Sequence, residues 1–276
     1  MLEYPELNTI TNQMKKELIG KTITSGVMVK RSGNMFMGED EPLKYVLLNR
    51  GKIIDIDFFA PEIFIVLDNG YGILFCQSGG SILYHKAATD VTKNCNIRFD
   101  FSDGSCLTYT MLLWTLGIYA ITCDDWNLRK KRNEIQYFKP LDKNTFEDYL
   151  VFIDRCKEQE KMSIKIFLSK FVSGVMSTFA AEILLYAKIY PSVQLKNLNK
   201  DEHRRIYESI INVLTLACEK GGRTTEFNLY KQKGSYKAMA ERKNIGKDCP
   251  VCGNIMAKNS TGGVTAFCPV CQVKNK

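Results

Sequence analysis

Four cysteines near the C-terminus have the spacing of a metal site. Cys249 and Cys252 form one Cys-x-x-Cys pair, and Cys268 and Cys271 form a second pair after fifteen intervening residues. Each pair presents two sulfurs from one tight turn, and four thiolates in a tetrahedron are preferred ligands of structural Zn²⁺. Reduced thiols or disulfides are the alternatives. Because the protein fills all four positions, we expect one structural zinc ion per chain, with no open position for catalysis.

The residues between the two cysteine pairs are expected to fold as a hairpin. Gly253 follows the first pair, and Gly262-Gly263 provides a tight turn at which the chain can reverse. This hairpin would bring the two pairs together around the metal. A structural finger positions other parts of the protein, so any reaction chemistry must come from the rest of the chain.

Positive charge is concentrated in the C-terminal part of this 276-residue chain. Residues 163–276 contain 18 Lys and Arg against 8 Asp and Glu, whereas residues 1–162 contain 20 against 22. A basic half that ends in a four-cysteine finger favours a polyanionic partner. A solvated basic face without a partner is the alternative.

Composition favours a globular cytoplasmic protein of about two domains. The hydrophobic content is 45%, and no apolar run is long enough to span a membrane. The first ten residues lack the basic and apolar regions of a signal peptide. The remaining cysteines lie in apolar or mixed surroundings, as buried thiols do in a reducing compartment. They are Cys76, Cys95, Cys106, Cys123, Cys156 and Cys218.

The N-terminal part predicts one helix followed by short strands. Leu7, Ile10, Met14 and Leu18 recur at helical spacing. From residue 21 to about residue 123, segments rich in Ile, Val, Phe and Thr are separated by turn signals, and such a pattern is typical of an antiparallel sandwich or barrel. The expected strands are Lys21–Val29, Ile53–Phe59, Ile63–Leu67, Gly72–Cys76, Asn96–Phe101 and Cys106–Met111.

The C-terminal part predicts helices after a polar linker. The segment from Asp124 to Asp142 is polar and basic, and we interpret its Arg129–Arg132 run as solvated charge. Helical segments are expected from Phe146, from Ile164, over Phe179–Ala187 and over Lys200–Lys220. The last of these has the clearest boundaries, because Asn199 and Glu202 can form a capping box and Gly221-Gly222 can end the helix.

The expected fold class is therefore α+β with several domains. Residues 1–125 would form an N-terminal β-sandwich with a flanking helix, and residues 126–145 would form the linker. Residues 146–243 would form a helical domain, and residues 244–276 would form the zinc-finger hairpin.

Short motifs along nearly the whole chain occur in the order of a known family. Glu3-Tyr-Pro-Glu6 is similar to its Pro-Glu-Leu-Pro-Glu opening, and Gly20–Ile23 is similar to its Gly-Lys-x-Ile. Residues 164–184 resemble its helix–two-turn–helix segment, and Gly221–Thr225 and Cys268–Gln272 resemble its C-terminal part. Only the finger is a strong motif alone, and the shared order carries the resemblance. This family is the formamidopyrimidine-DNA glycosylase / endonuclease VIII family of base-excision repair enzymes.

The resemblance implies a DNA glycosylase that binds duplex DNA with a damaged base. In the family, the N-terminal amine, usually on a proline, attacks C1′ of the nucleotide and forms a Schiff base. The base leaves, and β-elimination then cuts the strand. An α-amine has a pKa near ~7.7–8.0, so much of it is a free nucleophile at neutral pH. The target base must also leave the stack to be reached. We expect a monomer without a protein or membrane partner, associated with the nucleoid.

Three residues at the N-terminus are the candidate catalytic residues. Glu3 matches the family's proton-transferring Glu, and Met1 would carry the free amine. Glu6 belongs to the same opening, but a carboxylate near a helix start is also favoured by the helix dipole alone.

The chain differs from the family pattern where the nucleophile is expected. Leu2 stands in the place of the proline, and a large residue after Met1 favours retention of that methionine. The free amine would then lie one residue further from Glu3, which makes the strand-cleaving lyase step doubtful. The family's Arg-Arg-Phe loop corresponds to Met111–Gly117, where Trp114 is either a stacking wedge or a core residue.

Five residues are the candidate DNA contacts. Lys165 and Lys170 are the phosphate candidates by position, and Ser177 replaces the family's phosphate-binding Asn. Arg223 either contacts phosphate or caps the preceding helix, and Lys258 is the cation nearest the hairpin turn. Solvated surface side chains are the alternative for the lysines.

Three functions are compatible with these residues. The first is a DNA glycosylase with a weak lyase step, because hydrolytic release of the damaged base needs only a positioned carboxylate and water. The second is a catalytically lapsed relative that binds damaged DNA. The third is a zinc-ribbon RNA-binding protein, although no aromatic RNA-stacking motif supports it.

Overall fold

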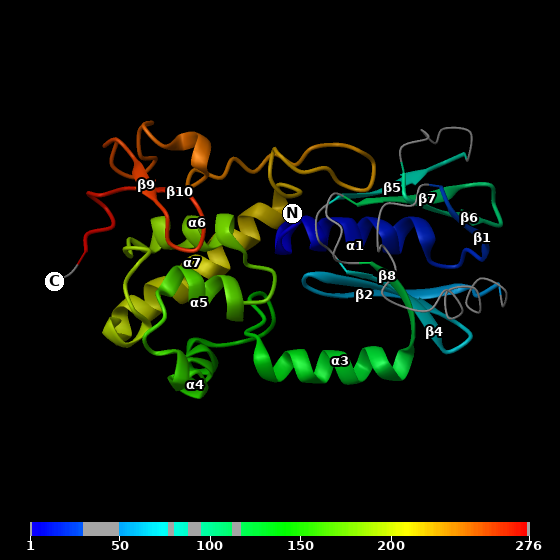
Figure 1. Cartoon of the computed structure of the whole chain (residues 1–276), viewed down its shortest axis with the longest axis horizontal. Coiled ribbons are helices and arrows are strands. Elements are labelled where there is room, and N and C mark those ends of the chain that lie inside the picture. The colour runs from blue at the N-terminus through cyan, green and yellow to red at the C-terminus, as the bar shows by residue number, and fades with distance from the viewer. Residues whose placement is uncertain (1, 30–49, 77–79, 88–94, 112–116, 275–276) are drawn as a thin grey trace. The chain divides into compact units, whose positions relative to one another are not determined.

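The computed structural model describes residues 2–29, 50–76, 80–87, 95–111 and 117–274. The chain divides into two compact units. Unit 1 consists of residues 1–133 and 220–235, and unit 2 consists of residues 134–219 and 236–276. Segment 220–235 thus belongs with the N-terminal residues, whereas the sequence had predicted it within a helical domain of residues 146–243. Figure 1 shows the elements of both units.

Helix α1 (Tyr4–Leu18) begins unit 1. Its start is fixed by a capping box between Glu3 and Glu6, with Pro5 in the first turn. One face of the helix is buried and confirms the predicted helical spacing. It includes Leu7, Ile10, Met14 and Leu18.

Two four-stranded antiparallel sheets occupy the described part of unit 1. The first sheet has the order β1-β6-β7-β5, and the second has the order β2-β3-β4-β8. The strands of the first sheet are β1 (Ile23–Met28), β6 (Ile97–Phe101), β7 (Cys106–Met111) and β5 (Gly80–His85). Those of the second are β2 (Ile53–Phe59), β3 (Glu62–Leu67), β4 (Tyr71–Cys76) and β8 (Ile118–Thr122).

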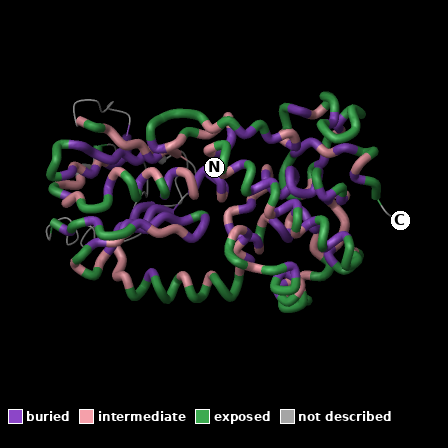
Figure 2. Tube along the Cα trace, turned by 180° about the vertical axis from the view of Figure 1, so that it is seen from behind, coloured by how far each residue is buried: buried purple, intermediate pink, exposed green. Residues whose placement is uncertain are grey.

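Aromatic contacts show that the two sheets pack face to face. The ring of Phe75 in β4 lies 6.3 Å from that of Phe99 in β6 and 5.5 Å from that of Tyr109 in β7, centroid to centroid. All three side chains are buried and share one apolar core with the buried face of α1. Figure 2 marks these strands as largely buried. The predicted β-sandwich with a flanking helix is confirmed.

Helix α3 (Cys123–Gln136) occupies the start of the predicted linker. Trp126 is 3% exposed, stacks on Phe64 of β3 at 5.0 Å, and donates its indole N–H to Asp57 of β2 at 3.1 Å. Lys130 also binds Asp57, at 2.6 Å, and Arg129 binds Glu62. The basic run predicted as solvated charge therefore begins with two cations that hold α3 against the second sheet.

Unit 2 contains four α-helices in its described residues, besides the end of α3. Asn199 and Glu202 form the predicted capping box at the start of the longest one, with two hydrogen bonds of 2.9 Å. Gly174, at a φ of 72°, lies in the short connection between the helices Ile164–Phe171 and Ser177–Ala187. The helices are α4 (Phe146–Arg155), α5 (Ile164–Phe171), α6 (Ser177–Ala187) and α7 (Lys200–Glu219).

Among the described residues of both units, no helix is long and apolar enough to cross a membrane.

A two-stranded hairpin lies near the end of the chain. Strands β9 (Ala257–Asn259) and β10 (Thr265–Phe267) pair antiparallel. Between them, Gly262 and Gly263 have φ angles of 59° and 104°, which favour glycine. The predicted reversal at this glycine pair is confirmed. Three short 3-10 helices complete the described elements: Lys157–Gln159, Leu195–Asn197 and Arg242–Asn244.

Candidate active site and metal centre

Two carboxylates are buried together at the start of α1. The side chains of Glu3 and Glu6 are each 3% exposed. The Glu3 backbone N–H donates to Glu6 Oε2 at 2.8 Å, which fixes the first turn of the helix. The helix N-terminus favours negative charge, but a buried carboxylate without a cation is strongly destabilising.

Arg223 supplies the cation from a segment 217 positions away from Glu6 along the chain. Its backbone N–H and Nε donate to Glu6 Oε1 at 2.8 and 3.0 Å, and its Nη2 donates to Glu6 Oε2 at 3.0 Å. Its Nη1 lies 3.3 Å from Glu3 Oε1. The guanidinium therefore connects the two carboxylates.

Glycines make this approach of segment 220–235 to α1 possible. Gly221 and Gly222 follow α7 with φ angles of 67° and 90°. A Cβ at Gly222 would lie 2.8 Å from Glu6 Cγ, and a Cβ at Gly234 would lie 2.1 Å from the Gly222 carbonyl oxygen. The backbone reaches Glu6 because no side chains stand at these positions. The predicted ending of the helix at the Gly pair is confirmed, and its consequence is the placement of Arg223.

The cluster contains more negative than positive charge. Glu3 and Glu6 share the Arg223 side chain, which is 6% exposed, and Glu226 approaches Nη2 at 3.8 Å from a more exposed position. Burial by itself lowers the pKa of the Arg223 guanidinium, but Glu3 and Glu6 raise it above its ordinary value, so that it stays charged. Ionisable groups in such buried, charged surroundings are often found at functional sites.

The other N-terminal candidates lie in different settings. Met1, the predicted source of the amine, is outside the described residues, and so is Trp114. Leu2 is 2% exposed and packs in the apolar core of unit 1. The Leu2 side chain therefore has a packing role.

Two of the predicted DNA contacts bind the hairpin turn. Lys165 Nζ donates to the Gly263 carbonyl and to Thr265 Oγ1, both at 2.8 Å, and Ser177 Oγ donates to the Gly262 carbonyl at 3.0 Å. Lys165 is fully buried, and this burial lowers the pKa of its amine to about 8. These hydrogen bonds of both side chains thus go to groups of the protein's own hairpin.

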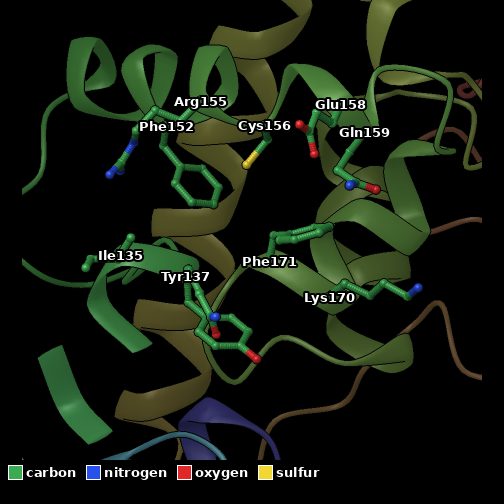
Figure 3. Close-up of a pocket in the computed structure, with 10 residues that line it drawn as sticks. Ile135, Tyr137, Phe152, Arg155, Cys156, Glu158, Gln159, Lys170 and Phe171 are labelled. Carbon is green, nitrogen blue, oxygen red and sulfur yellow. The ribbon is translucent and has the colours of Figure 1, made fainter. Parts of the chain in front are cut away.

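The two remaining lysine candidates are exposed. Lys258 lies on β9, and Lys170 lies at the end of α5. Lys170 also lines a pocket of about 380 Å³ in unit 2, together with aromatic side chains such as Phe171 and Tyr137. Figure 3 shows its amine pointing away from these rings. Both lysines can therefore meet a polyanion from solvent.

The four cysteines come together as a candidate metal centre. The Sγ atoms of Cys249, Cys252, Cys268 and Cys271 all lie within 4.8 Å of one another. Backbone N–H groups of Val251 and Cys271 approach Cys249 Sγ and Cys268 Sγ at 3.4 and 3.3 Å. Hydrogen bonds from the Asn254 side chain and backbone lower the pKa of Cys252 to about 6. Four sulfurs this close together, with such N–H donors, fit a metal ion.

Glu182 has a structural role that the sequence analysis did not assign. This fully buried carboxylate of α6 accepts bonds from the Tyr236 hydroxyl at 3.0 Å and from the N–H groups of Met239 and Ala240 at 3.1 and 2.7 Å. It thereby ties segment 236–240 to the helices. A single acid within the apolar run Ala180–Leu185 is the signal that could have revealed a buried, hydrogen-bonded group.

Comparisons with known proteins agree with the order of motifs. No family model matches the chain. Formamidopyrimidine-DNA glycosylases of Bacillus cereus and Streptococcus thermophilus are 26% and 28% identical, and each alignment covers 99% of both chains. The crystal structure of Lactococcus lactis Fpg with DNA containing N7-benzyl-Fapy-dG has a TM-score of 0.86 at 22% identity, over 99% of this chain and 100% of that one. This last likeness shows the fold, and the two curated relatives are similar to the chain over nearly its whole length.

Proposed function

We propose that this protein is a DNA glycosylase that removes damaged bases from DNA in base-excision repair. Full-length relatives carry that name, and the same fold occurs in solved complexes with DNA that contains a modified base or an abasic site. Within the chain, the main support for this proposal is the buried cluster of Glu3, Glu6 and Arg223 at the start of α1. Its proposed location is the nucleoid.

Glu3 is the proposed general base of a hydrolytic reaction. Its carboxylate takes a proton from a water molecule, whose oxygen bonds to C1′ of the flipped nucleotide while the N-glycosidic bond breaks. The electron pair of that bond leaves with the base, which takes a proton from solvent. Glu6 has another proposed role, because its oxygens already accept hydrogen bonds from the Glu3 backbone and from Arg223. It positions the cluster.

The strand-cleaving lyase step is proposed to be weak or absent. The buried Leu2 replaces the proline that carries the amine in the family. If Met1 is retained, its primary amine starts one residue further from Glu3. A misplacement of about 1 Å can cost on the order of a hundredfold in rate.

The four cysteines are proposed to hold one structural zinc ion. Bound zinc would join the two cysteine pairs and order the hairpin, and it would take no part in the reaction. Metal analysis of protein purified without chelator should find one zinc per chain, and Cys268→Ser should lose it while unit 1 stays folded. Purified wild-type protein without zinc would contradict this assignment.

DNA contacts are proposed for both kinds of candidate in unit 2. The exposed amines of Lys170 and Lys258 would contact phosphates directly. Lys165 and Ser177 would support binding by holding the hairpin turn through Gly262 and Gly263. Each neutralised phosphate makes binding to duplex DNA more dependent on salt.

An assay with single-lesion duplexes tests the proposed reaction. The protein is incubated with DNA that contains an oxidised purine, an oxidised pyrimidine or an abasic site. Base release is read after hot alkali, and lyase cleavage is read without it. We expect base release without efficient cleavage. A borohydride-trapped adduct with efficient cleavage would overturn the lyase proposal, and tight binding without base release on any substrate would identify a DNA-binding protein instead.

A further inference from the structure

We propose that Arg223 is a positioning residue that keeps Glu3 ionised, and that Glu6 both holds Arg223 and opposes its effect. The ionisation of Glu3 would then be set by the balance between one cation and a second carboxylate. The inference deepens the proposed function and rests on it, because it assigns Glu3 to base release.

Arg223 makes two kinds of contact: hydrogen bonds that fix its position, and one contact with the Glu3 carboxylate. Three hydrogen bonds of 2.8 to 3.0 Å, from its backbone N–H, Nε and Nη2, go to the two oxygens of Glu6. These bonds fix both the position and the plane of the guanidinium. The remaining Nη1 faces Glu3 Oε1 at 3.3 Å. Glu6 therefore orients the guanidinium, and the positive charge of the guanidinium acts on the Glu3 carboxylate.

Burial makes this field strong. The side chains of Glu3 and Glu6 are 3% exposed and that of Arg223 is 6% exposed, so little water screens their interaction. An opposite charge at this distance favours an ionised carboxylate, and a second carboxylate nearby disfavours it. Arg223 and Glu6 are charged groups that contact Glu3, and Glu226 lies 3.8 Å from Nη2 of Arg223. The Met1 amine lies outside the described residues.

Segment 220–235 is attached along one face of α1, so the position of Arg223 is built into the fold. Gln13 Oε1 accepts the Leu229 N–H at 3.0 Å, and Glu17 Oε1 accepts the Tyr230 hydroxyl at 2.7 Å. Glu6, Gln13 and Glu17 are seven and four residues apart, which places them on the same side of a helix. Three attachments along one helix face keep the segment, and with it the guanidinium, in register with Glu3.

The test compares the pH dependence of base release in variants with opposite expected shifts. In single-turnover assays, the rate should fall toward acid pH as Glu3 takes up a proton. Glu6→Gln removes the competing charge, while its amide oxygen can still accept the bonds from the Arg223 backbone N–H and Nε, so this fall should move to lower pH by about one unit. Arg223→Met removes the cation and should move it to higher pH by about one unit or more. Arg223→Lys keeps the charge and should stay close to the wild type.

Arg129→Met is the matched control. It removes the guanidinium that pairs with Glu62 in the same unit, and neither residue belongs to the Glu3 cluster. Its base release should fall at the same pH as that of the wild type. Coinciding profiles for wild type, Glu6→Gln and Arg223→Met would overturn the proposal, as would equal shifts in the Arg129→Met control.

A titration that needs no activity separates this inference from the proposed function. The carboxyl carbon of Glu3 is followed by carbon-13 NMR and identified by its loss in Glu3→Gln. Its midpoint should lie lower in Glu6→Gln than in the wild type, and an unchanged or higher midpoint overturns the inference. A wild type that releases no base refutes the proposed function, while this titration still decides the role of the cluster. If Arg223→Met does not fold, Glu6→Gln carries the test.

Discussion

Two Arg–Glu clusters in unit 1 differ in burial and in charge balance. In the first, Arg129 of α3 binds Glu62 of β3, and the two side chains are 48% and 10% exposed. One cation meets one carboxylate there, and the neighbouring Cys76 stays protonated because burial raises the pKa of its thiol to about 12. In the second, Arg223 serves both Glu3 and Glu6, and all three side chains are almost completely buried.

This difference separates a structural ion pair, Arg129–Glu62, which we call the clamp, from a candidate active site, the Arg223 cluster. A balanced pair whose arginine is half exposed should lose less free energy when it is broken, because water reaches the arginine side of it. A buried cluster with more carboxylates than cations has no such replacement, and it can persist only where the surrounding fold enforces it. Arg129 and Glu62 accordingly hold a helix against a sheet, while the Arg223 cluster retains an acidic group that chemistry can use.

The largest expected effect is on base release in Glu3→Gln. Loss of a general base typically costs about two to four powers of ten in rate. Glu62→Gln is the matched control, because it changes a carboxylate of the same unit in the clamp, and its rate should stay within a few-fold of the wild type. Single-turnover base release measures both. Equal losses in the two variants would remove the distinction between clamp and site.

Stability should distinguish the two arginines. Arg223→Met leaves two buried carboxylates without their cation and should lower the free energy of unfolding by about 3–5 kcal/mol. Arg129→Met leaves one buried carboxylate, Glu62, without a pair that water partly reaches, and should cost less, about 1–3 kcal/mol. Urea unfolding at neutral pH gives both values. The Arg223→Met deficit should shrink toward acid pH, because protonated carboxylates need no cation, and a deficit that grows instead would argue against this explanation.

The glycine at the approach of segment 220–235 offers a smaller, sharper test. Gly222→Ala places a Cβ 2.8 Å from Glu6 Cγ at a φ of 90°, whereas Gly70→Ala at a φ of 82° meets nothing within 4 Å. Both substitutions should cost about 1 kcal/mol for the backbone conformation. Gly222→Ala should cost about 1 kcal/mol more and reduce base release, because Glu6 and Arg223 must shift. Similar results for both variants would show that the approach tolerates displacement.

The smallest expected effects concern the exposed lysines of unit 2. Lys170→Ala and Lys258→Ala should each weaken DNA binding and flatten the plot of log K against log salt by about 0.9, if each contacts one phosphate. Arg129→Ala, whose cation is occupied by Glu62, should leave the slope unchanged. Titrations over a range of salt concentrations provide the slopes. A salt-independent affinity of the wild type would contradict a phosphate interface altogether.

Several parts of the fold could be predicted because their causes are local. The buried face of α1, the capping box of Asn199 and Glu202 and the glycine turn at Gly262-Gly263 depend on residues within a few positions of one another. The spacing of the two cysteine pairs belongs to the same class. Helix α3, predicted as a polar linker, was missed because it lacks a strong apolar periodicity and is held by the contacts of Trp126 and Arg129 with the second sheet.

The sequence by itself determined the order of sandwich, helices and hairpin and the four cysteines with metal-site spacing. Tertiary structure decided which charges meet. Arg223 pairs with Glu6 across 217 positions, and Lys165 reaches the hairpin turn across 98. The sequence does not distinguish a solvated charged residue from a buried one. The free energy of the charged group depends on the water that it loses and the partner that it gains. Both are properties of packing between distant segments, which residue spacing does not encode.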